Sequence, residues 1–372
     1  MSDSSRIAIV QPAMAPHRFA CFSALAARPD IELLVVYLRR GPQPYDWAAD
    51  ERRAVFPRIE LETTKRGRIH AFPSSVTGAL RRFRPDVTIV GGWDEPSYYL
   101  VAALRPLLGR RVVVWAESTP HDWRRRSFMK DVLKRTIIRR ADAVVVPGSA
   151  ARGYCEGLGL SVRSWYVAPN AVDNDRFAAG ARLAREQGLR PFQAPGPVFL
   201  YVGRLDPEKG LEVLLKSWAK IERTIGGSLI LAGAGSQESP LKRYAEELGL
   251  TRVQFAGFVS QADLPAWYGC ADAFVFPSLS DPWGLVINEA MSCGLPVITT
   301  SAPGAAADLV RDGVNGRLVP PGNEVALADA ISDVAADVSL RSAMGEASIR
   351  RIAAFSPDVW AEAIARMVIE IQ

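Results

Sequence analysis

The sequence contains few of the residues that build disulfides and metal sites. Its 372 residues include four cysteines, Cys21, Cys155, Cys270 and Cys293, which are scattered and form no CxxC or Cys/His spacing. We therefore expect free thiols in a reducing cytosol, with neither a disulfide framework nor a zinc site.

Long apolar runs are also absent. No uninterrupted apolar segment approaches the ~20 residues that a membrane-spanning helix needs. The opening stretch does not resemble a signal peptide, because residues 6–10 already read as a strand. We expect a cytoplasmic protein without a membrane-spanning helix.

The net charge of +5 is unevenly distributed along the chain. Residues 1–180 hold 28 Lys and Arg against 18 Asp and Glu, whereas residues 181–372 hold 17 against 22. The positive half fits an anionic membrane, a lipid-linked phosphate or an acidic polymer, but equally an arginine-rich solvated surface. Within it, residues 124–140 place apolar side chains among basic ones. Such a helix most often covers a sheet; the alternative is that it lies on an anionic membrane.

Short apolar runs alternate with helix-length amphipathic segments from end to end. This pattern predicts parallel sheets covered on both faces, and two such series predict two doubly wound α/β domains. A Pro- and Gly-rich segment at residues 186–197 predicts the linker, so we place one domain at 1–185 and the other at 195–355. The expected strands are 7–11, 33–38, 87–91, 112–116, 143–147, 165–168, 198–203, 229–232, 253–258, 273–276 and 297–300.

The stretch SLSDPWGLVINEAMSCGLPVITTS at 278–301 is the most informative part of the chain. It places Asp281 eight positions before Glu289. Asp281 followed by Pro282 predicts a helix start with Asp281 as the N-cap. Eight residues at ~1.5 Å each would separate the two acids by roughly 12 Å along the axis, and amides at the helix start suit a phosphate. Capping alone explains Asp281, whereas a carboxylate at Glu289 needs a partner or solvent.

Basic residues and glycines follow the predicted strands of the second half. Arg204 and Lys209 lie on a strand-to-helix loop, where a guanidinium fork and a point charge suit a diphosphate; a solvated loop is the alternative. Gly233 and Gly235 follow the next strand and would let the backbone approach a ligand closely. The strand end at 255–259 offers backbone groups for a base edge. Each of these signals is weak alone.

Together these residues resemble family 4 of the retaining nucleotide-sugar glycosyltransferases, also called group 1, which have the GT-B fold. The matching features are Gly-Arg-Leu-x-x-x-Lys-Gly, Gly-Ala-Gly, Ala-Gly-Phe and the acid-x7-Glu helix. The resemblance covers residues 140–320 well and the first 130 loosely. It implies two Rossmann-like domains facing across a cleft, with a crossover helix over 356–372 that packs back on the first domain.

The resemblance also implies roles for single residues. Arg204 and Lys209 would bind the donor diphosphate, assisted by the amides of Leu285 and Val286, and Glu289 would hold the ribose hydroxyls. The other residues implied at the donor site are Gly203, Gly233, Gly235, Phe258 and Gly284.

Three further positions bear on the reacting centre. Asp281 would face the transferred sugar, where the family usually has Glu, so the shorter side chain leaves the sugar open. In the first domain, Glu117 and His121 both follow a strand near the position where many relatives carry a histidine. The sequence does not decide between them.

The implied reaction moves a sugar from a nucleoside-diphosphate sugar, with UDP favoured, to an acceptor hydroxyl with retention of configuration. Neither a metal nor another cofactor is expected, because Arg204 and Lys209 would neutralise the diphosphate. A polysaccharide or lipid-linked acceptor fits the basic first half and implies peripheral contact with the inner membrane face. A small acceptor such as an aminocyclitol fits the acids near Glu117. A non-catalytic nucleotide-sugar-binding protein is a further alternative, and no nucleic-acid partner is expected.

Overall fold

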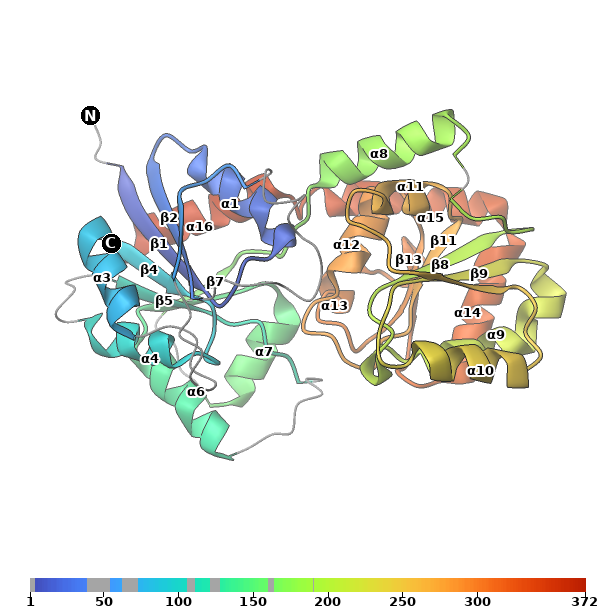
Figure 1. Ribbon diagram of the computed structural model, residues 1–372, viewed down its shortest axis with the longest axis horizontal. Helices are drawn as coiled ribbons and strands as arrows, with labels where there is room; N and C mark the ends of the chain where they lie inside the picture. The colour runs from blue at the N-terminus through green and yellow to red at the C-terminus, as the bar shows by residue number, and fades with distance from the viewer. Residues whose placement is uncertain are drawn as a thin grey trace. The chain divides into compact units, whose positions relative to one another are not determined.

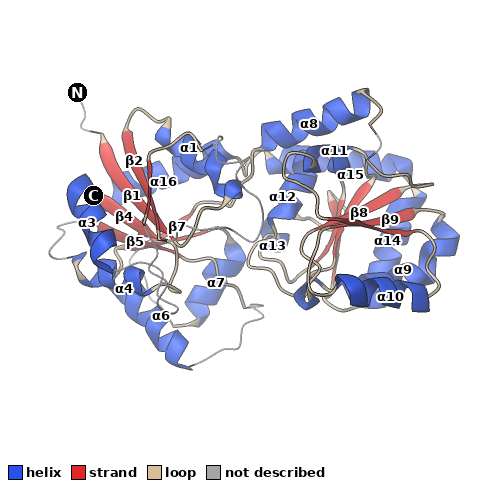
Figure 2. Cartoon of the chain, in the orientation of Figure 1, coloured by secondary structure: helices blue, strands red, loops and turns tan. Residues whose placement is uncertain are grey.

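The computed structural model describes residues 4–38, 54–61, 73–105, 111–120, 128–159, 164–189 and 191–372. The chain divides into two compact units. The first contains residues 1–118, 124–172 and 356–372, and the second contains 119–123 and 173–355. Each unit has a sheet with helices on both of its faces (Figures 1 and 2). The prediction of two parallel-sheet α/β domains is therefore confirmed.

The first unit has a seven-stranded sheet among its described residues, and all of its paired strands are parallel. The order β3-β2-β1-β4-β5-β6-β7 reverses direction between β1 and β4. The short edge strand β3 was not expected, because its three residues are only partly buried and form no apolar run. The strands are β1 (Ser5–Gln11), β2 (Ile31–Tyr37), β3 (Arg58–Glu60), β4 (Val87–Val90), β5 (Arg111–Trp115), β6 (Ala143–Val146) and β7 (Trp165–Val167).

Alternate residues of β1 face opposite sides of this sheet, as the strand period of two requires. Ile7 and Ile9 belong to one buried cluster, with α1 and α16, whereas Ala8 and Val10 belong to another, with α3, α4, α6 and α7. None of the helices described has both the length and the apolar character needed to cross a bilayer. The helices of this unit are η1 (Pro16–Arg18), α1 (Phe19–Ala26), α3 (Pro73–Phe83), α4 (Pro96–Ala103), α6 (Phe128–Arg140), α7 (Ser149–Gly157) and α16 (Pro357–Ile371).

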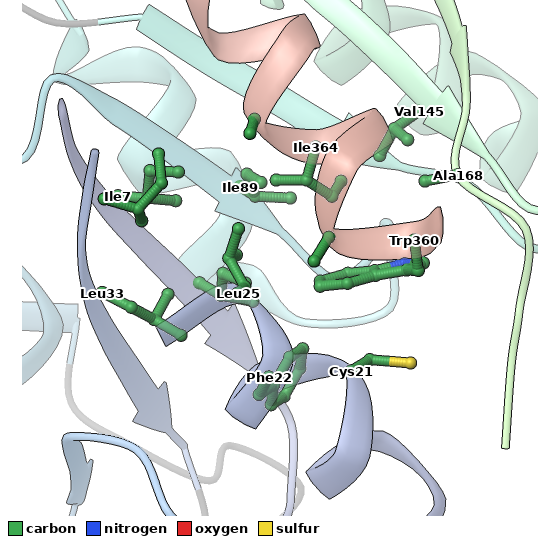
Figure 3. Packing of buried hydrophobic residues seen from close by; sticks show 14 of the residues in the cluster. Ile7, Cys21, Phe22, Leu25, Leu33, Ile89, Val145, Ala168, Trp360 and Ile364 are labelled. Carbon is green, nitrogen blue, oxygen red and sulfur yellow. The ribbon is translucent and has the colours of Figure 1, made fainter. Parts of the chain in front are cut away.

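The last helix of the chain, α16, packs into the first unit beside α1 and β7 (Figure 1). Its start is well defined: the Ser356 hydroxyl accepts from the N–H of Val359 at 3.2 Å, and proline occupies the first turn. Trp360 is fully buried, with its ring centroid 5.7 Å from that of Phe22 and 5.4 Å from that of Trp115. Figure 3 shows Trp360 and Phe22 in this core. Helices α1 and α16, from opposite ends of the sequence, therefore pack into the same core.

The second unit has a six-stranded sheet of parallel pairs, in the order β10-β9-β8-β11-β12-β13. Its strands are β8 (Val198–Val202), β9 (Ser228–Ala232), β10 (Val253–Gly257), β11 (Ala273–Phe276), β12 (Val297–Thr300) and β13 (Gly316–Val319), of which β13 was not expected. Its helices are α8 (Asn174–Glu186), η2 (Pro207–Lys209), α9 (Leu211–Ile225), α10 (Glu238–Glu247), α11 (Leu264–Gly269), α12 (Leu285–Ser292), α13 (Ala306–Leu309), α14 (Glu324–Ala336) and α15 (Val338–Ile352).

The two units divide between Val172 and Asp173, before the linker that the sequence predicted at 186–197. Helix α8 packs on α11 and α12 and therefore belongs to the second unit. The Arg185 guanidinium donates to the carbonyl oxygens of Gly269 at 2.9 Å and Cys293 at 2.6 Å. The predicted boundary at 185 was wrong because the Pro- and Gly-rich segment marks a loop, not the change of core.

The burial of Trp360 yields a prediction for stability. Trp360→Ala should lower the free energy of unfolding by about 3–5 kcal/mol, because it empties a large site in a packed core. The neighbouring Val359→Ala, on a side chain that is 38% exposed, should cost about 1 kcal/mol or less. Urea unfolding followed by circular dichroism measures both. Equal losses in the two variants would contradict the place of α16 in this core.

Candidate functional site

The order of the second sheet reverses between β8 and β11, and the loops after these strands lie at that point. The loop after β8 spans 203–210, and the loop after β11 spans 277–284 and leads into α12. The N–H groups of Leu279 and Ser280 donate to the carbonyl oxygen of Glu208 at 2.9 and 3.2 Å. These bonds join the two loops.

Glycines permit the close approach of these loops. Gly210 has φ +69°, and a Cβ there would lie 2.4 Å from the Pro277 carbonyl oxygen. A Cβ at Gly233 would lie 1.8 Å from the carbonyl oxygen of Gly203, which links the loops after β8 and β9. A Cβ at Gly235 would meet the backbone of Leu205 at 2.5 Å. The glycines that the sequence assigned to ligand approach are thus required for packing the loops on one another.

Lys209 and Asp281 form an ion pair between the two loops. The Lys209 Nζ lies 2.7 Å from Asp281 Oδ2, and the two side chains are 9% and 18% exposed. The other carboxylate oxygen, Oδ1, accepts the N–H of Trp283 at 3.0 Å. Both carboxylate oxygens of Asp281 are therefore occupied: Oδ2 pairs with the Lys209 ammonium, and Oδ1 accepts a backbone hydrogen bond.

Asp281 is not the N-cap of the following helix, so that prediction was wrong. Helix α12 begins at Leu285, and its N-cap is Gly284 with φ +94°. Asp281 instead closes a local turn through Trp283, as Asp side chains commonly do. Because residues 281–284 are not helical, the predicted separation of roughly 12 Å between Asp281 and Glu289 along one helix axis does not apply. Gly284 has no side chain that could cap the N–H groups of Leu285 and Val286, which lie in the first turn.

Arg204 lies at the start of the loop after β8 and is engaged by two acids of the same loop. Its guanidinium pairs with Asp206, and its Nη2 lies 2.7 Å from Glu208 Oε1. Asp206 in turn accepts from the Ser236 N–H at 3.1 Å and from its hydroxyl at 2.8 Å. Burial opposes the charged form of Asp206, but the Ser236 hydrogen bonds and the charges of Arg204 and Lys209 lower its pKa. The arginine is half-exposed and held in place by carboxylates.

Glu289 is a buried carboxyl on α12, only 4% exposed. The fully buried Tyr268 of α11 donates its hydroxyl to Glu289 Oε2 at 2.8 Å. Burial raises the pKa of Glu289 from 4.5 to about 7, although hydrogen bonds from Tyr268 and Gln261 and the charge of Arg176 lower it. The partner that the sequence required for Glu289 is therefore a phenol from a different helix.

Phe258 follows β10, where the pairing with β9 shifts register between Phe255 and Gly257. The carbonyl oxygen of Gly257 accepts the N–H of Gly233 at 2.7 Å, so the loop after β9 is joined to the end of β10. The Phe258 side chain is 57% exposed. A flat apolar side chain at a strand end can cover the face of a planar ligand.

In the first unit, Glu117 follows β5 and is held by residues that come after β1 and β7. Arg18 Nη2 lies 2.7 Å from Glu117 Oε2, and the Asn170 amide donates to Oε1 at 2.9 Å. The Arg18 guanidinium lies 4.2 Å from the centre of the Trp115 ring. Burial opposes the charge on Glu117, but Arg18 and Asn170 outweigh it and lower the pKa. His121, the alternative candidate, lies outside the described residues.

Several residues of these sites were not assigned roles from the sequence. Asp206 and Glu208 follow Arg204 by two and four positions, so their spacing could have indicated the pairs. Tyr268 gave no such signal, because it lies on another helix 21 positions before Glu289. Within the described parts of the chain, no three His, Cys, Asp or Glu gather as metal ligands.

The second unit therefore presents chemistry suited to an anion. Arg204 and Lys209 supply two cations, and the start of α12 supplies backbone N–H groups and the positive end of a helix dipole. A phosphate or diphosphate fits such an arrangement, with Arg offering a fork and Lys a point charge.

Two family models match the chain. One, described as "Glycosyl transferases group 1", matches residues 189–351, and the other, "Glycosyltransferase Family 4", matches residues 22–176. D-inositol 3-phosphate glycosyltransferase of Corynebacterium jeikeium (strain K411) is 33% identical over 255 residues, covering 64% of this chain and 60% of that protein. GDP-mannose-dependent alpha-(1-6)-phosphatidylinositol monomannoside mannosyltransferase of Mycolicibacterium smegmatis (strain ATCC 700084 / mc(2)155) is 29% identical over 282 residues, covering 70% and 72%.

The fold also resembles solved structures. Anabaena Alr3699/HepE, solved in complex with UDP, superposes with a TM-score of 0.80 over 98% of this chain and 100% of that one, at 21% identity. Sucrose-phosphate synthase from Thermosynechococcus elongatus gives a TM-score of 0.78 over 99% of each chain, also at 21% identity. These likenesses concern the fold, and they confirm the predicted GT-B architecture.

The buried carboxyl of Glu289 predicts a pH-dependent stability. Between pH 4.5 and 7 the folded chain keeps a proton that the unfolded chain has released, so this group's contribution to stability falls as the pH rises. The loss over that interval is about 3 kcal/mol and is complete above the folded pKa. Glu289→Gln, which stays neutral, should therefore gain up to about 3 kcal/mol over the wild type between pH 5 and 8.

Urea unfolding at both pH values measures this gain. Glu247→Gln, on the exposed face of α10, is the control and should show no such trend. A Glu289→Gln difference from the wild type that is the same at pH 5 and pH 8 would show that the carboxyl is not held protonated.

Proposed function

Because this chain belongs to glycosyltransferase family 4, we propose that it moves a sugar from a nucleoside-diphosphate sugar to an acceptor hydroxyl with retention of configuration. The observation that carries this proposal is the pair of cations, Arg204 and Lys209, on the loop after β8, which is hydrogen-bonded to the loop that leads to the start of α12. These groups match the charge of a departing diphosphate.

The donor is assigned to the second unit. Arg204 and Lys209 bind its diphosphate, with the amides of Leu285 and Val286 at the helix start, and Glu289 accepts hydrogen bonds from the ribose hydroxyls. Arg204 is paired with Asp206 and Glu208, and Lys209 with Asp281. A diphosphate would compete with these carboxylates for both cations, so donor binding includes an exchange of ion-pair partners.

In the transfer step, the bond between the sugar's anomeric carbon and the diphosphate oxygen breaks, and the bonding electrons leave with the diphosphate. The acceptor oxygen forms the new bond on the same face, and its proton passes to a phosphate oxygen of the leaving group. Arg204 and Lys209 stabilise the negative charge that grows on the leaving group. Once they exchange their carboxylate partners for the diphosphate, these cations neutralise it, and the proposed reaction includes neither a metal nor another cofactor.

Asp281 and Glu117 have different tasks in this scheme. Asp281 fixes the ammonium of Lys209. In this proposal it also faces the transferred sugar. Glu117 carries a lowered pKa, so at neutral pH it is a carboxylate that accepts hydrogen bonds rather than an acid that donates a proton. Arg18 and Asn170 hold it in one orientation, which suits a group that orients an acceptor hydroxyl.

The acceptor is proposed to be a growing polysaccharide or a lipid-linked saccharide, handled in the cytoplasm. The excess of Lys and Arg in residues 1–180 supports an acceptor that carries phosphate or lies at an anionic surface. The two relatives above are named for a phosphorylated inositol and for a phosphatidylinositol mannoside. A small polyhydroxylated acceptor such as an aminocyclitol is the alternative.

Donor binding can be tested without knowing the acceptor. UDP-glucose, UDP-N-acetylglucosamine, GDP-mannose and ADP-glucose should be compared by thermal shift, because one relative is named for GDP-mannose and a structure of the same fold was solved with UDP. We expect UDP-sugars to raise the melting temperature most; a ligand at about 100 times its Kd adds about 2.7 kcal/mol. No shift with any of the four would contradict the donor site. A shift without donor hydrolysis or transfer would indicate a non-catalytic binding protein.

Turnover should depend on the two cations. Arg204→Ala and Lys209→Ala should each lower kcat/KM by about 100-fold or more, because each removes charge that stabilises the transition state. Arg243→Ala, on the exposed face of α10, is the matched control and should retain its rate. Release of nucleoside diphosphate from the donor measures all three. Near-normal rates in both site variants would contradict the roles assigned to them.

A further inference from the structure

Helix α6 carries apolar side chains on the side that faces away from its own core. Met129 is 73% exposed, Val132 43% and Leu133 45%. Positions 129, 132 and 133 are spaced by three and four residues, so these side chains lie on one face of the helix. The expectation that this helix covers a sheet explains its buried face, but it does not explain the exposed apolar face.

The orientation of α6 is fixed by contacts on the opposite side. Ile137 and Ile138 are buried in the core cluster that also contains residues of β4 and β5. Lys134 donates to the Tyr154 hydroxyl at 2.6 Å, and Arg105 donates to the Arg140 carbonyl oxygen at 3.2 Å. Rotating the helix to hide its exposed apolar residues would remove both isoleucines from the core.

Basic side chains surround the exposed apolar face. Lys130 and Arg135 flank it, and Arg139 and Arg140 follow in the last turn; all four are exposed. Asp131 is the one acid between residues 128 and 140. An apolar face flanked by several cations and a single anion is complementary to a surface that is apolar inside and negatively charged outside.

We propose that the outer face of α6 binds the surface of an anionic lipid bilayer, with Met129, Val132 and Leu133 inserted among the lipid chains and the basic residues on the headgroups. A protein partner fits less well, because a stable interface needs about 800 Å² per partner and three side chains supply much less. A bilayer adds attraction for each nearby cation, so a small apolar insertion is sufficient. The inference does not depend on the donor site, because it concerns a separate surface of the first unit.

Vesicle flotation of the full chain tests this surface. Vesicles of phosphatidylcholine alone are compared with vesicles of equal parts phosphatidylcholine and phosphatidylglycerol. We expect binding to the anionic vesicles, little binding to the neutral ones, and weakening at high salt, which screens charges near the surface. Equal binding to both kinds of vesicle, or binding to neither, would overturn the proposal.

Two sets of variants locate the contact. Met129→Gln, Val132→Gln and Leu133→Gln together should lower the partition onto anionic vesicles by about tenfold or more, because the inserted groups are lost. The control, Val325→Gln, Val338→Gln and Ile349→Gln, changes side chains that are 59%, 69% and 52% exposed on α14 and α15 and should leave binding unchanged.

Charge is tested in the same way. Lys130→Gln, Arg135→Gln and Arg139→Gln together should also lower the partition by about tenfold or more, whereas Arg182→Gln, Arg223→Gln and Arg350→Gln should not. All of these side chains are exposed, so circular dichroism and melting temperature should stay at wild-type values.

Undiminished vesicle binding by either α6 triple variant would overturn the assignment to this helix. The competing possibility is that a second copy of the chain covers this face, and light scattering of the protein without vesicles tests for such self-association. Self-association that the apolar triple variant abolishes would assign the face to a second copy of the chain and overturn the lipid proposal. Donor binding by the same variants, measured by thermal shift, should be unchanged, so a failure of this proposal is distinct from a failure of the proposed function.

Discussion

The ion pair between Lys209 and Asp281 joins the loop after β8 to the loop after β11 at the reversal point of the second sheet. Its lysine is almost fully buried, so its charge needs a partner near at hand. Gly210 lets the two loops touch, and the Glu208 carbonyl accepts two N–H groups across the same contact. The position of the helix start, and with it the proposed diphosphate site, depends on this junction.

The same unit contains groups that stability alone would not favour. Glu289 is a buried carboxyl whose pKa is raised to about 7. Arg204 forms ion pairs with two carboxylates, and the buried Lys209 pairs with a third, Asp281. Apolar replacements would favour folding more, which agrees with the ligand-binding roles that we propose for these groups. Each of the two cations has a carboxylate partner, with which the proposed donor would compete.

Local sequence signals predicted the sheets well because buried parallel strands are short, continuous apolar runs. They failed where a signal has two explanations. Asp281 and Pro282 resemble a helix start, but the Asp side chain closes a turn, and α12 begins at Leu285 with Gly284 as its N-cap. The Pro- and Gly-rich segment resembles a linker, yet the core changes before α8. Strand β3 was missed because an edge strand that is only partly buried has no apolar run.

The sequence by itself determined the fold class and which charged residues lie on the loops after β8 and β11, because both follow from local spacing of side chains along the chain. Only the tertiary structure decided their partners. Tyr268 reaches Glu289 from another helix, and the return of α16 places Trp360 against Phe22. The direction of α6 was likewise undecided by its sequence, since Val132 and Leu133 are as apolar as Ile137 and Ile138. Contact with the sheet buries one pair and leaves the other exposed.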